Sequence, residues 1–289
     1  MRRYLLVIVS VIVVLIAGAI FGFNQIDKSN FGIPRFYAWR VLSGEFHGGH
    51  RTSINGVSIY YETYGNGPPV LVLHGAMGFL ETMHYFIPPL VSTHTVIAVD
   101  SRAQGRSTDS SAPISYALMG DDMIELMDSL GMAQADVIGW SDGGIIGLDM
   151  AMKHPGRVRR LIAIGANYDV NGIAPKELDP NALRSLAEQV RPFYENVAPD
   201  PRYFAVLEKK IQLMVTTQPH YTLAELGQIK ARTLIVAGDH DMILRAHTDR
   251  LAHAISGAQE IIVPDATHFG PLEKPDVYEA MAVKFLNGP

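Results

Sequence analysis

The chain has 289 residues, a net charge of −5 and an apolar content of 48%. This length and composition allow a large buried core, and the lack of a strongly basic block argues against nucleic-acid binding. The sequence contains no cysteine, which excludes disulfides, cysteine-ligated metals and a thiol nucleophile.

The amino-terminal residues 1–23 differ from the rest of the chain, because two arginines precede an apolar run over residues 4–23. A helix of this length, at about 1.5 Å per residue, spans roughly the 30 Å of a bilayer core, which predicts a membrane anchor with its arginines in the cytoplasm. Alternatively, Ala17-Gly18-Ala19 has the small-residue pattern of a signal-peptidase site. A buried core helix is disfavoured because no polar face interrupts the run. The folded body is therefore expected outside the cytoplasm, anchored through residues 4–23 or, after cleavage, secreted or periplasmic.

Residues 24–50 show no clear periodicity and are predicted to form a connector, with the globular body starting near residue 51. Asn55-Gly56 interrupts an alternating pattern over residues 52–62 and predicts a hairpin. Short apolar runs then recur, as expected for strands that are buried on both faces of a sheet. These runs cover residues 70–73, 95–99, 135–139, 161–164, 233–237 and 260–263.

Helical patterns separate most of these runs, at residues 114–130, 143–154 and 275–287. Alternating strands and helices predict an α/β fold with a mostly parallel sheet and helices on both faces. Residues 170–228 contain helical patterns and prolines without a convincing strand. We expect this interval to form a helical cap above the sheet, with residues 51–169 and 229–289 forming the core.

The segment Gly139-Trp140-Ser141-Asp142-Gly143 matches the pattern G-x-S-x-G between a predicted strand and a predicted helix. A sharp strand-to-helix turn exposes the serine side chain, and the flanking glycines let the turn close without Cβ clashes. The amino terminus of the following helix also favours developing negative charge. The pentapeptide alone is weak evidence, but in this context it predicts that Ser141 is a catalytic nucleophile.

A nucleophilic serine needs a base and an orienting carboxylate, which in this arrangement should follow it in the order acid and then histidine. His268 follows the apolar run 260–263 and is the expected base. His74 also follows a predicted strand, but it precedes the serine and is expected to shape a loop. His240 is expected to be a solvated neighbour.

Asp241 is the expected acid, because it lies just after the apolar run 233–237. Asp239 is nearer that strand and is expected to cap the turn. Asp169 follows an earlier predicted strand and is an alternative acid for the same histidine.

The tetrahedral intermediate of acyl transfer requires two hydrogen-bond donors for its oxyanion. The expected donors are the backbone N–H of Asp142 and that of Ala76, in the loop after the run 70–73, with Met77 as the alternative to Ala76. No phosphate-binding loop, dinucleotide fingerprint or metal-ligand cluster stands out in the sequence. We therefore expect neither a cofactor nor a metal.

Together these features resemble the α/β-hydrolase superfamily over nearly all of residues 51–289. The resemblance is carried by His74-Gly75, residues 100–107, the Ser141 turn, Gly238-x-x-Asp241 and His268. It implies the α/β-hydrolase fold, with a mostly parallel sheet of the eight-stranded type, helices on both faces and a cap at residues 170–228 that sets substrate choice. Ala103 stands where the family commonly has glycine, a departure that concerns loop geometry rather than chemistry.

A closer resemblance connects residues 139–145 and Gly165-Ala166-Asn167 with the valacyclovir hydrolase (biphenyl hydrolase-like) group. This resemblance implies hydrolysis of α-amino-acid esters, with the side chain of Asp142 holding the ammonium group of the substrate. A carboxylate in a cleft would favour a cationic substrate. The alternative role for Asp142 is to cap the following helix.

The expected reaction is hydrolysis of a carboxylic ester, or a related acyl bond, of a small molecule through an acyl-enzyme on Ser141. A proline-iminopeptidase-like aminopeptidase, a lactonase, a C–C bond hydrolase and a cofactor-free perhydrolase share this set of residues and are the alternatives. Haloalkane dehalogenases and epoxide hydrolases carry aspartate at the turn, so Ser141 argues against both. A membrane-tethered binding module with a disused hydrolase fold is the non-enzymatic alternative, and the complete set of catalytic residues argues against it.

Overall fold

The computed structural model describes residues 32–288 and divides into two compact units, one ending at Gly44 and the other beginning at Glu45. The predicted anchor or signal segment, residues 1–23, lies outside the described residues. Within residues 32–288, no helix is both long and apolar enough to cross a membrane.

The described part of the first unit contains helix α2, Ile33–Leu42. Pro34 lies in its first turn, where a missing backbone N–H costs no helical hydrogen bond. The helix occupies part of the connector predicted for residues 24–50, which corrects that prediction. The sequence of α2, IPRFYAWRVL, has apolar residues on all sides of the helix, so it shows no single apolar stripe, and Phe36 alone among its side chains is buried.

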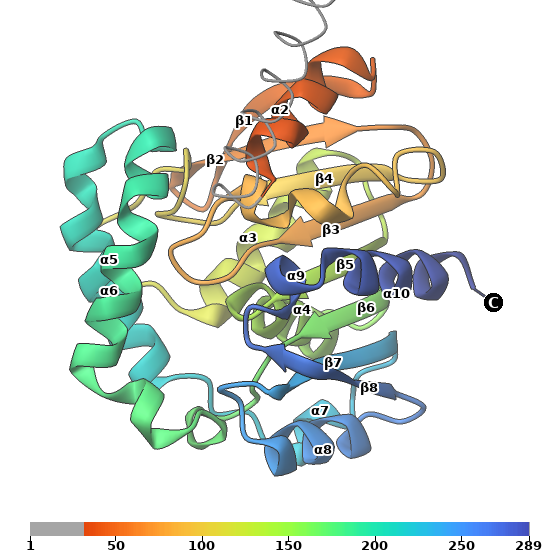
Figure 1. Ribbon diagram of the computed structural model, residues 1–289. Coiled ribbons are helices and arrows are strands. Elements are labelled where there is room, and N and C mark those ends of the chain that lie inside the picture. The colour runs from red at the N-terminus through yellow and green to blue at the C-terminus, as the bar shows by residue number, and fades with distance from the viewer. Residues whose placement is uncertain (1–31, 289) are drawn as a thin grey trace, which may run out of the picture. The chain divides into compact units, whose positions relative to one another are not determined.

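The second unit is built on an eight-stranded sheet with the order β1-β2-β4-β3-β5-β6-β7-β8 (Figure 1). Strand β2 pairs antiparallel with both of its neighbours, and the other neighbouring pairs are parallel. This arrangement confirms the predicted α/β fold with a mostly parallel sheet. The strands are β1 Phe46–Ile54, β2 Val57–Tyr64, β3 Pro69–Leu73, β4 Thr95–Asp100, β5 Ala135–Trp140, β6 Val158–Ile164, β7 Arg232–His240 and β8 Gln259–Thr267.

The first two strands form the hairpin predicted at Asn55-Gly56. Both turn residues have a positive φ, 45° and 79°, as a type I′ turn requires. Strand β1 begins at Phe46, before the predicted start of the body at residue 51. Its pairing register with β2 shifts between Phe46 and Gly49, and such an irregular edge lacks the alternation by which a sequence reveals a strand.

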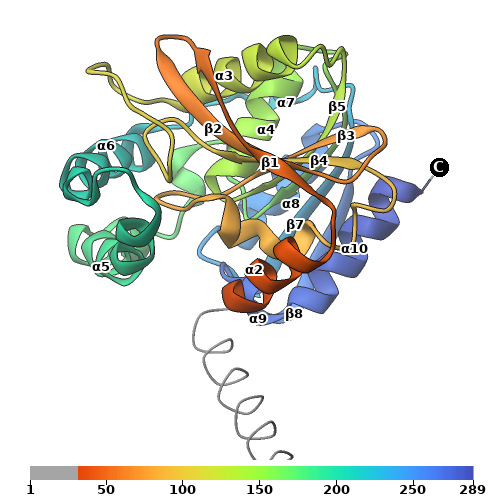
Figure 2. The same cartoon turned by 90° about the horizontal axis from the view of Figure 1, so that it is seen from above.

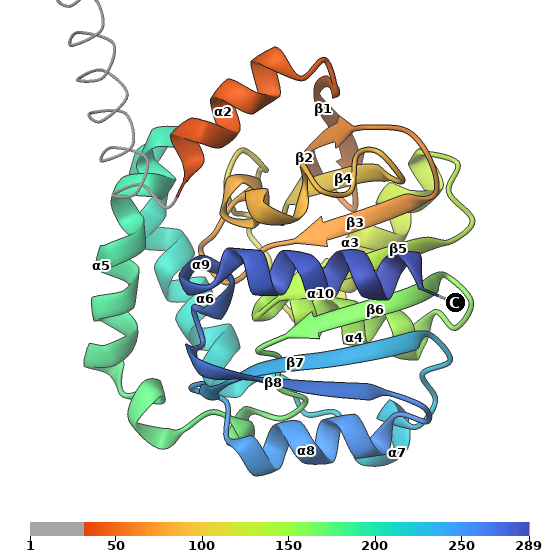
Figure 3. The same ribbon diagram turned by 45° about the vertical axis from the view of Figure 1, so that its right-hand side comes forward.

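Helices cover both faces of the sheet, as a largely parallel sheet requires. Helices α3 (Tyr116–Ser129) and α4 (Asp142–Lys153) lie on one face, and α10 (Pro275–Asn287) lies on the other (Figures 2 and 3). The remaining helices of the core connections are η1 Leu80–Phe86, α7 Leu223–Leu226, α8 Arg245–Ala254 and α9 Gly270–Glu273.

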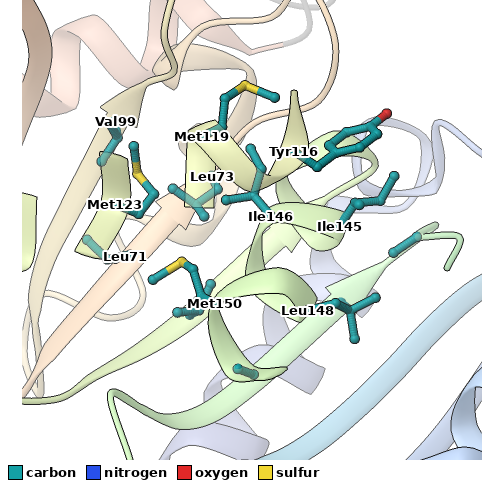
Figure 4. Packing of buried hydrophobic residues seen from close by; sticks show 14 of the residues in the cluster. Leu71, Leu73, Val99, Tyr116, Met119, Met123, Ile145, Ile146, Leu148 and Met150 are labelled. Atoms are coloured by element: carbon teal, nitrogen blue, oxygen red, sulfur yellow. The ribbon is translucent and has the colours of Figure 1, made fainter. Parts of the chain in front are cut away.

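Buried apolar side chains of α3 and α4 pack against one face of β3 and β4 (Figure 4). Leu71 and Leu73 share that face because side chains alternate along a strand. Met119 and Met123 lie one helical turn apart on α3 and are fully buried, and their unbranched side chains suit an irregular interface. Each such burial contributes about 1.5–3 kcal/mol. This packing holds α4 in place, and α4 begins directly after Ser141.

The interval between β6 and β7 is helical, and residues 170–228 contain none of the strands of the sheet. Its long helices, α5 (Pro180–Val197) and α6 (Phe204–Thr217), stand beside the carboxyl ends of the parallel strands (Figure 3). The rings of Tyr194 and Phe204, 5.3 Å apart, join these helices to each other. Short 3-10 helices complete the segment at η2 Val170–Gly172, η3 Pro175–Leu178 and η4 Pro201–Tyr203.

Lys210 of α6 ties this helical segment to the loop that follows β4. Its ammonium group donates to the carbonyls of Ser110 (2.7 Å) and Ala112 (2.9 Å) and pairs with the carboxylate of Asp109. The hydroxyl of Tyr203 donates to the same carboxylate. An ammonium group has three hydrogens, so these three acceptors satisfy it. The cap helix is therefore attached to the loop that leads into α3.

A buried ion pair joins the same loop to α3 and to the first hairpin. The guanidinium of Arg102 donates to both carboxylate oxygens of Asp122 (2.7 and 2.6 Å), and the Asn55 amide donates to Asp122 as well (3.0 Å). Two parallel N–H···O bonds give such a pair a defined geometry. The adjacent Ala103 has a φ of 68°, a left-handed conformation in which glycine carries no steric cost.

We expect Arg102→Met to lower the free energy of unfolding by about 3–5 kcal/mol, because it leaves the buried Asp122 carboxylate without its cation. Urea unfolding at pH 7 measures the change. Arg202→Met is the matched control, since Arg202 pairs with Asp200 on the exposed surface, where an ion pair contributes little. Equal unfolding midpoints for the two variants would contradict a structural role for the buried pair.

Candidate active site

Ser141 lies in a sharp turn between β5 and α4, with a φ of 56° and a ψ of −120°. A non-glycine residue in such a conformation costs about 1–3 kcal/mol, and it persists only when the surroundings enforce it. The two glycines of the pentapeptide provide the close packing that does so. A Cβ on Gly139 would lie 2.1 Å from the carbonyl oxygen of Gly143, and a Cβ on Gly143 would lie 2.1 Å from that of Leu73.

The structure brings Ser141, His268 and Asp241 together at the carboxyl ends of three strands. The Oγ of Ser141 lies 2.9 Å from Nε2 of His268, and Nδ1 of His268 lies 2.8 Å from Oδ1 of Asp241. Both ring nitrogens therefore have a partner, which corresponds to an Nδ1–H that donates to the carboxylate and an Nε2 that accepts from the serine hydroxyl. The geometry permits Ser141 to transfer its proton to His268.

The carboxylate of Asp241 is well suited to staying ionised. Burial alone would raise the pKa of Asp241, but the neighbouring His268 and the backbone N–H of Ile243, which donates to Oδ1 (2.9 Å), outweigh burial and lower that pKa. An ionised partner at Nδ1 holds the imidazole in one tautomer and stabilises the imidazolium form.

The other candidate acids have partners elsewhere. Asp239 accepts the backbone N–H of Ala266 (3.2 Å), as expected for a residue that shapes the turn. Asp169 pairs with His220 (2.8 Å) instead of with His268.

The rings of the other two candidate histidines have partners other than Ser141. His74 is buried, donates through Nδ1 to the Gly75 carbonyl (2.7 Å) and accepts the Ser101 N–H at Nε2 (3.0 Å), so it shapes the loop after β3. Burial lowers the pKa of His74 to about 4, which keeps it neutral. His240 is exposed. Its ring, with Asp239 and Asp265, forms an exposed group whose ligand atoms lie within 4.8 Å of one another, the arrangement nearest to a metal site among the described residues.

The loop after β3 lies against Ser141. A Cβ on Gly75 would come within 3.1 Å of the Cβ of Ser141. Ala76 follows directly in this loop, and Asp142 is the first residue of α4. Within residues 32–288, the fold uses neither the Ala76 nor the Asp142 N–H in a hydrogen bond, so both are free to bind an oxyanion. Met77, the alternative to Ala76, has a φ of 56° in the same loop.

Asp142 is only 4% exposed, although it follows Ser141 directly. Its Oδ1 accepts the hydroxyl of Tyr116 (2.8 Å), whereas its Oδ2 has no partner among the described residues. Neither oxygen of the Asp142 carboxylate accepts an N–H of α4, so the structure lacks the hydrogen bond that a capping role requires. Burial raises the pKa of Asp142 to about 6, although Tyr116 and His268 act in the opposite direction.

The sequence did not indicate a role for two residues at the site, Tyr116 and Trp140. Tyr116 holds the Asp142 carboxyl, yet a tyrosine at the start of an amphipathic helix is usually a core residue. Trp140 occupies a variable position of the G-x-S-x-G pattern, yet its indole N–H donates to the carbonyl of His268 (2.9 Å). Both contacts join residues that are far apart in the chain, so no local pattern indicates them.

A comparison with family models finds that residues 70–281 match a model described as the alpha/beta hydrolase family. Among curated proteins, a putative carbamate hydrolase RutD from Caulobacter vibrioides is 34% identical, over 80% of this chain and 96% of the relative. The serine hydrolase BPHL from Homo sapiens is 27% identical, over 82% of this chain and 85% of the relative.

Among solved structures, an enol-lactonase from Burkholderia xenovorans LB400 superimposes with a TM-score of 0.68 at 23% identity. The match covers 83% of this chain and 100% of the lactonase. At this level of identity the similarity concerns the fold.

The raised pKa of Asp142 predicts a pH-dependent cost to folding. The folded chain keeps this proton up to about pH 6, whereas the ordinary value is 3.8, so stability falls as the pH rises between these values and stays lower above them. Asp142→Asn removes this loss. Relative to wild type, we expect the variant to gain up to about 3 kcal/mol in unfolding free energy between pH 4 and pH 8.

Urea unfolding of the wild type and the variant at both pH values measures this gain. Asp276→Asn, at an exposed aspartate, reports any general effect of removing a carboxylate. A constant difference between Asp142→Asn and wild type across the pH range would show that the carboxyl is not destabilised by burial.

Proposed function

The chain belongs to the α/β-hydrolase family, and we propose that this hydrolase cleaves a carboxylic ester of a small molecule through an acyl-enzyme on Ser141. The observation that carries the proposal is the continuous chain of hydrogen bonds from Ser141 through His268 to Asp241, with distances of 2.9 and 2.8 Å. A serine hydroxyl becomes a useful nucleophile when such a base and orienting acid adjoin it.

In the first half of the proposed reaction, Oγ of Ser141 attacks the carbonyl carbon of the ester and its proton passes to Nε2 of His268. The N–H groups of Ala76 and Asp142 stabilise the oxyanion of the tetrahedral intermediate. His268 then protonates the leaving alcohol, which gives the acyl-enzyme. In the second half, His268 takes a proton from water, the water attacks the acyl carbon, and the acid leaves as Ser141 regains its proton.

A fluorophosphonate probe on the full-length chain tests the proposal, because such a probe modifies activated serines. We expect stoichiometric labelling of the wild type and none of Ser141→Ala, together with a fall in ester turnover of about 10⁴–10⁶-fold. Ser185→Ala, at an exposed serine of α5, is the matched control and should label as the wild type does. Equal labelling of Ser141→Ala and the control would refute the proposal.

The Asp142 carboxyl supports a narrower proposal, that the ester substrate carries an ammonium group near its carbonyl. The carboxyl adjoins the nucleophile, is held by Tyr116 and keeps one oxygen without a partner among the described residues. A buried carboxylate gains from binding a cation, since a charge-assisted hydrogen bond contributes about 1.5–3 kcal/mol. The resemblance to the valacyclovir hydrolase group points in the same direction.

The test compares the methyl esters of phenylalanine and of 3-phenylpropionic acid, which differ by one amino group. At pH 7 we expect kcat/KM to favour the amino ester by about 10–100-fold, the equivalent of one charge-assisted hydrogen bond. This preference should disappear in Asp142→Asn. In the wild type it should decrease as the pH falls from 7 to 5, because the carboxyl becomes neutral below its pKa of about 6 while the α-amino group stays protonated.

Tyr116→Phe is the intermediate control, because it keeps the carboxyl and removes one hydrogen bond to it. A preference that is independent of pH and unchanged in Asp142→Asn would reject ammonium recognition and leave general ester hydrolysis standing.

A further inference from the structure

Trp140 connects the nucleophile strand to the backbone of the base. It is the last residue of β5, it precedes Ser141, and it is 7% exposed. Its Nε1–H donates to the carbonyl oxygen of His268 at 2.9 Å, and its ring lies 6.2 Å from the imidazole. The ring of Phe269, the next residue, meets the indole edge-on at 6.0 Å.

The other hydrogen bonds of the base loop lie within the carboxyl-terminal part of the fold. Glu273 of α9 accepts both the N–H and the hydroxyl of Thr267 (2.9 and 2.6 Å), and the Thr267 hydroxyl accepts the Phe269 N–H (3.1 Å). These bonds shape the loop but do not relate it to β5. Among the hydrogen bonds of the described residues, those from Trp140 and Ser141 join the nucleophile turn to His268.

These two bonds behave differently during the proposed reaction. Once Oγ of Ser141 carries an acyl group, it has no proton to donate and its bond to His268 is lost. The bond from Trp140 to the His268 carbonyl involves no reacting atom and can persist. The base must nevertheless stay in place, because it has to activate the water that removes the acyl group.

We propose that Trp140 is a positioning residue that keeps the imidazole of His268 in place beside the acyl group during deacylation. This inference rests on the acyl-enzyme mechanism proposed above. A displacement of about 1 Å at a reacting group can lower a rate by roughly 10²-fold. Loss of the indole N–H should therefore slow deacylation more than acylation, since during acylation the Ser141 hydroxyl still helps to orient the imidazole.

Stopped-flow hydrolysis of p-nitrophenyl acetate by the full-length chain separates the two steps, as a burst of nitrophenol and a steady-state rate. For Trp140→Phe we expect the ratio of acylation rate to deacylation rate to rise at least about 10-fold over wild type. Trp39→Phe, at the other of the two tryptophans in the chain, is the matched control and should leave this ratio unchanged. An unchanged ratio in Trp140→Phe, whatever the overall rate or KM, overturns the inference.

A second measurement needs neither substrate nor a change at Trp140. Trp39→Phe leaves Trp140 as the only tryptophan, and the indole of Trp140 lies beside the imidazole of His268. We expect the fluorescence of this variant to change when His268→Gln is added. Fluorescence that is the same with and without His268 would overturn the coupling of Trp140 to the base. Failure of the wild type to react with the fluorophosphonate would instead refute the proposed function.

Discussion

The strained turn at Ser141 is the constraint on which the rest of the site depends. Its positive φ is held because the backbone of β3 and that of α4 approach each other where Gly143 has no side chain. The apolar layer between β3, β4 and the helices α3 and α4 supplies the free energy that keeps these elements in contact (Figure 4). Ser141 is thus held by packing over a large area, together with the bond from its backbone N–H to the carbonyl of Ile164 (2.7 Å).

Charged groups buried beside this layer order the loops around the nucleophile. Arg106 pairs with Glu81 and Asp100, and Asp100 accepts the backbone N–H of Leu80 at the start of η1 (2.7 Å). A buried charge without a partner raises the free energy of the folded state, so the three charged groups hold one another in place. Burial raises the pKa of Asp100 to about 7 in spite of the neighbouring Arg106. These contacts tie the segment that follows the proposed oxyanion loop to the loop after β4.

The features that the sequence predicted well are those with a local signature. Buried strands appear as short apolar runs, and Ser141, Asp241 and His268 each follow such a run, so their shared edge of the sheet could be predicted. Helix α2 and the first residues of β1 lack periodicity and were not predicted. Contacts such as that of Lys210 with the loop after β4, or of Trp140 with His268, depend on how distant segments meet. No local pattern in a single sequence indicates them.

The attachment of the cap has a consequence for how substrate preference can diversify. Lys210 on α6 binds the loop around residues 109–112, and the same loop leads into Tyr116, which holds Asp142 beside the nucleophile. The helical segment at residues 170–228 and the carboxyl of Asp142 are therefore held by the same loop. A chimera that took residues 170–228 from a relative would lose the contacts of Lys210 with residues 109–112 unless those loop residues were exchanged as well. Exchanging residues 109–116 together with the helical segment would change this attachment and the Tyr116 contact with Asp142 at the same time.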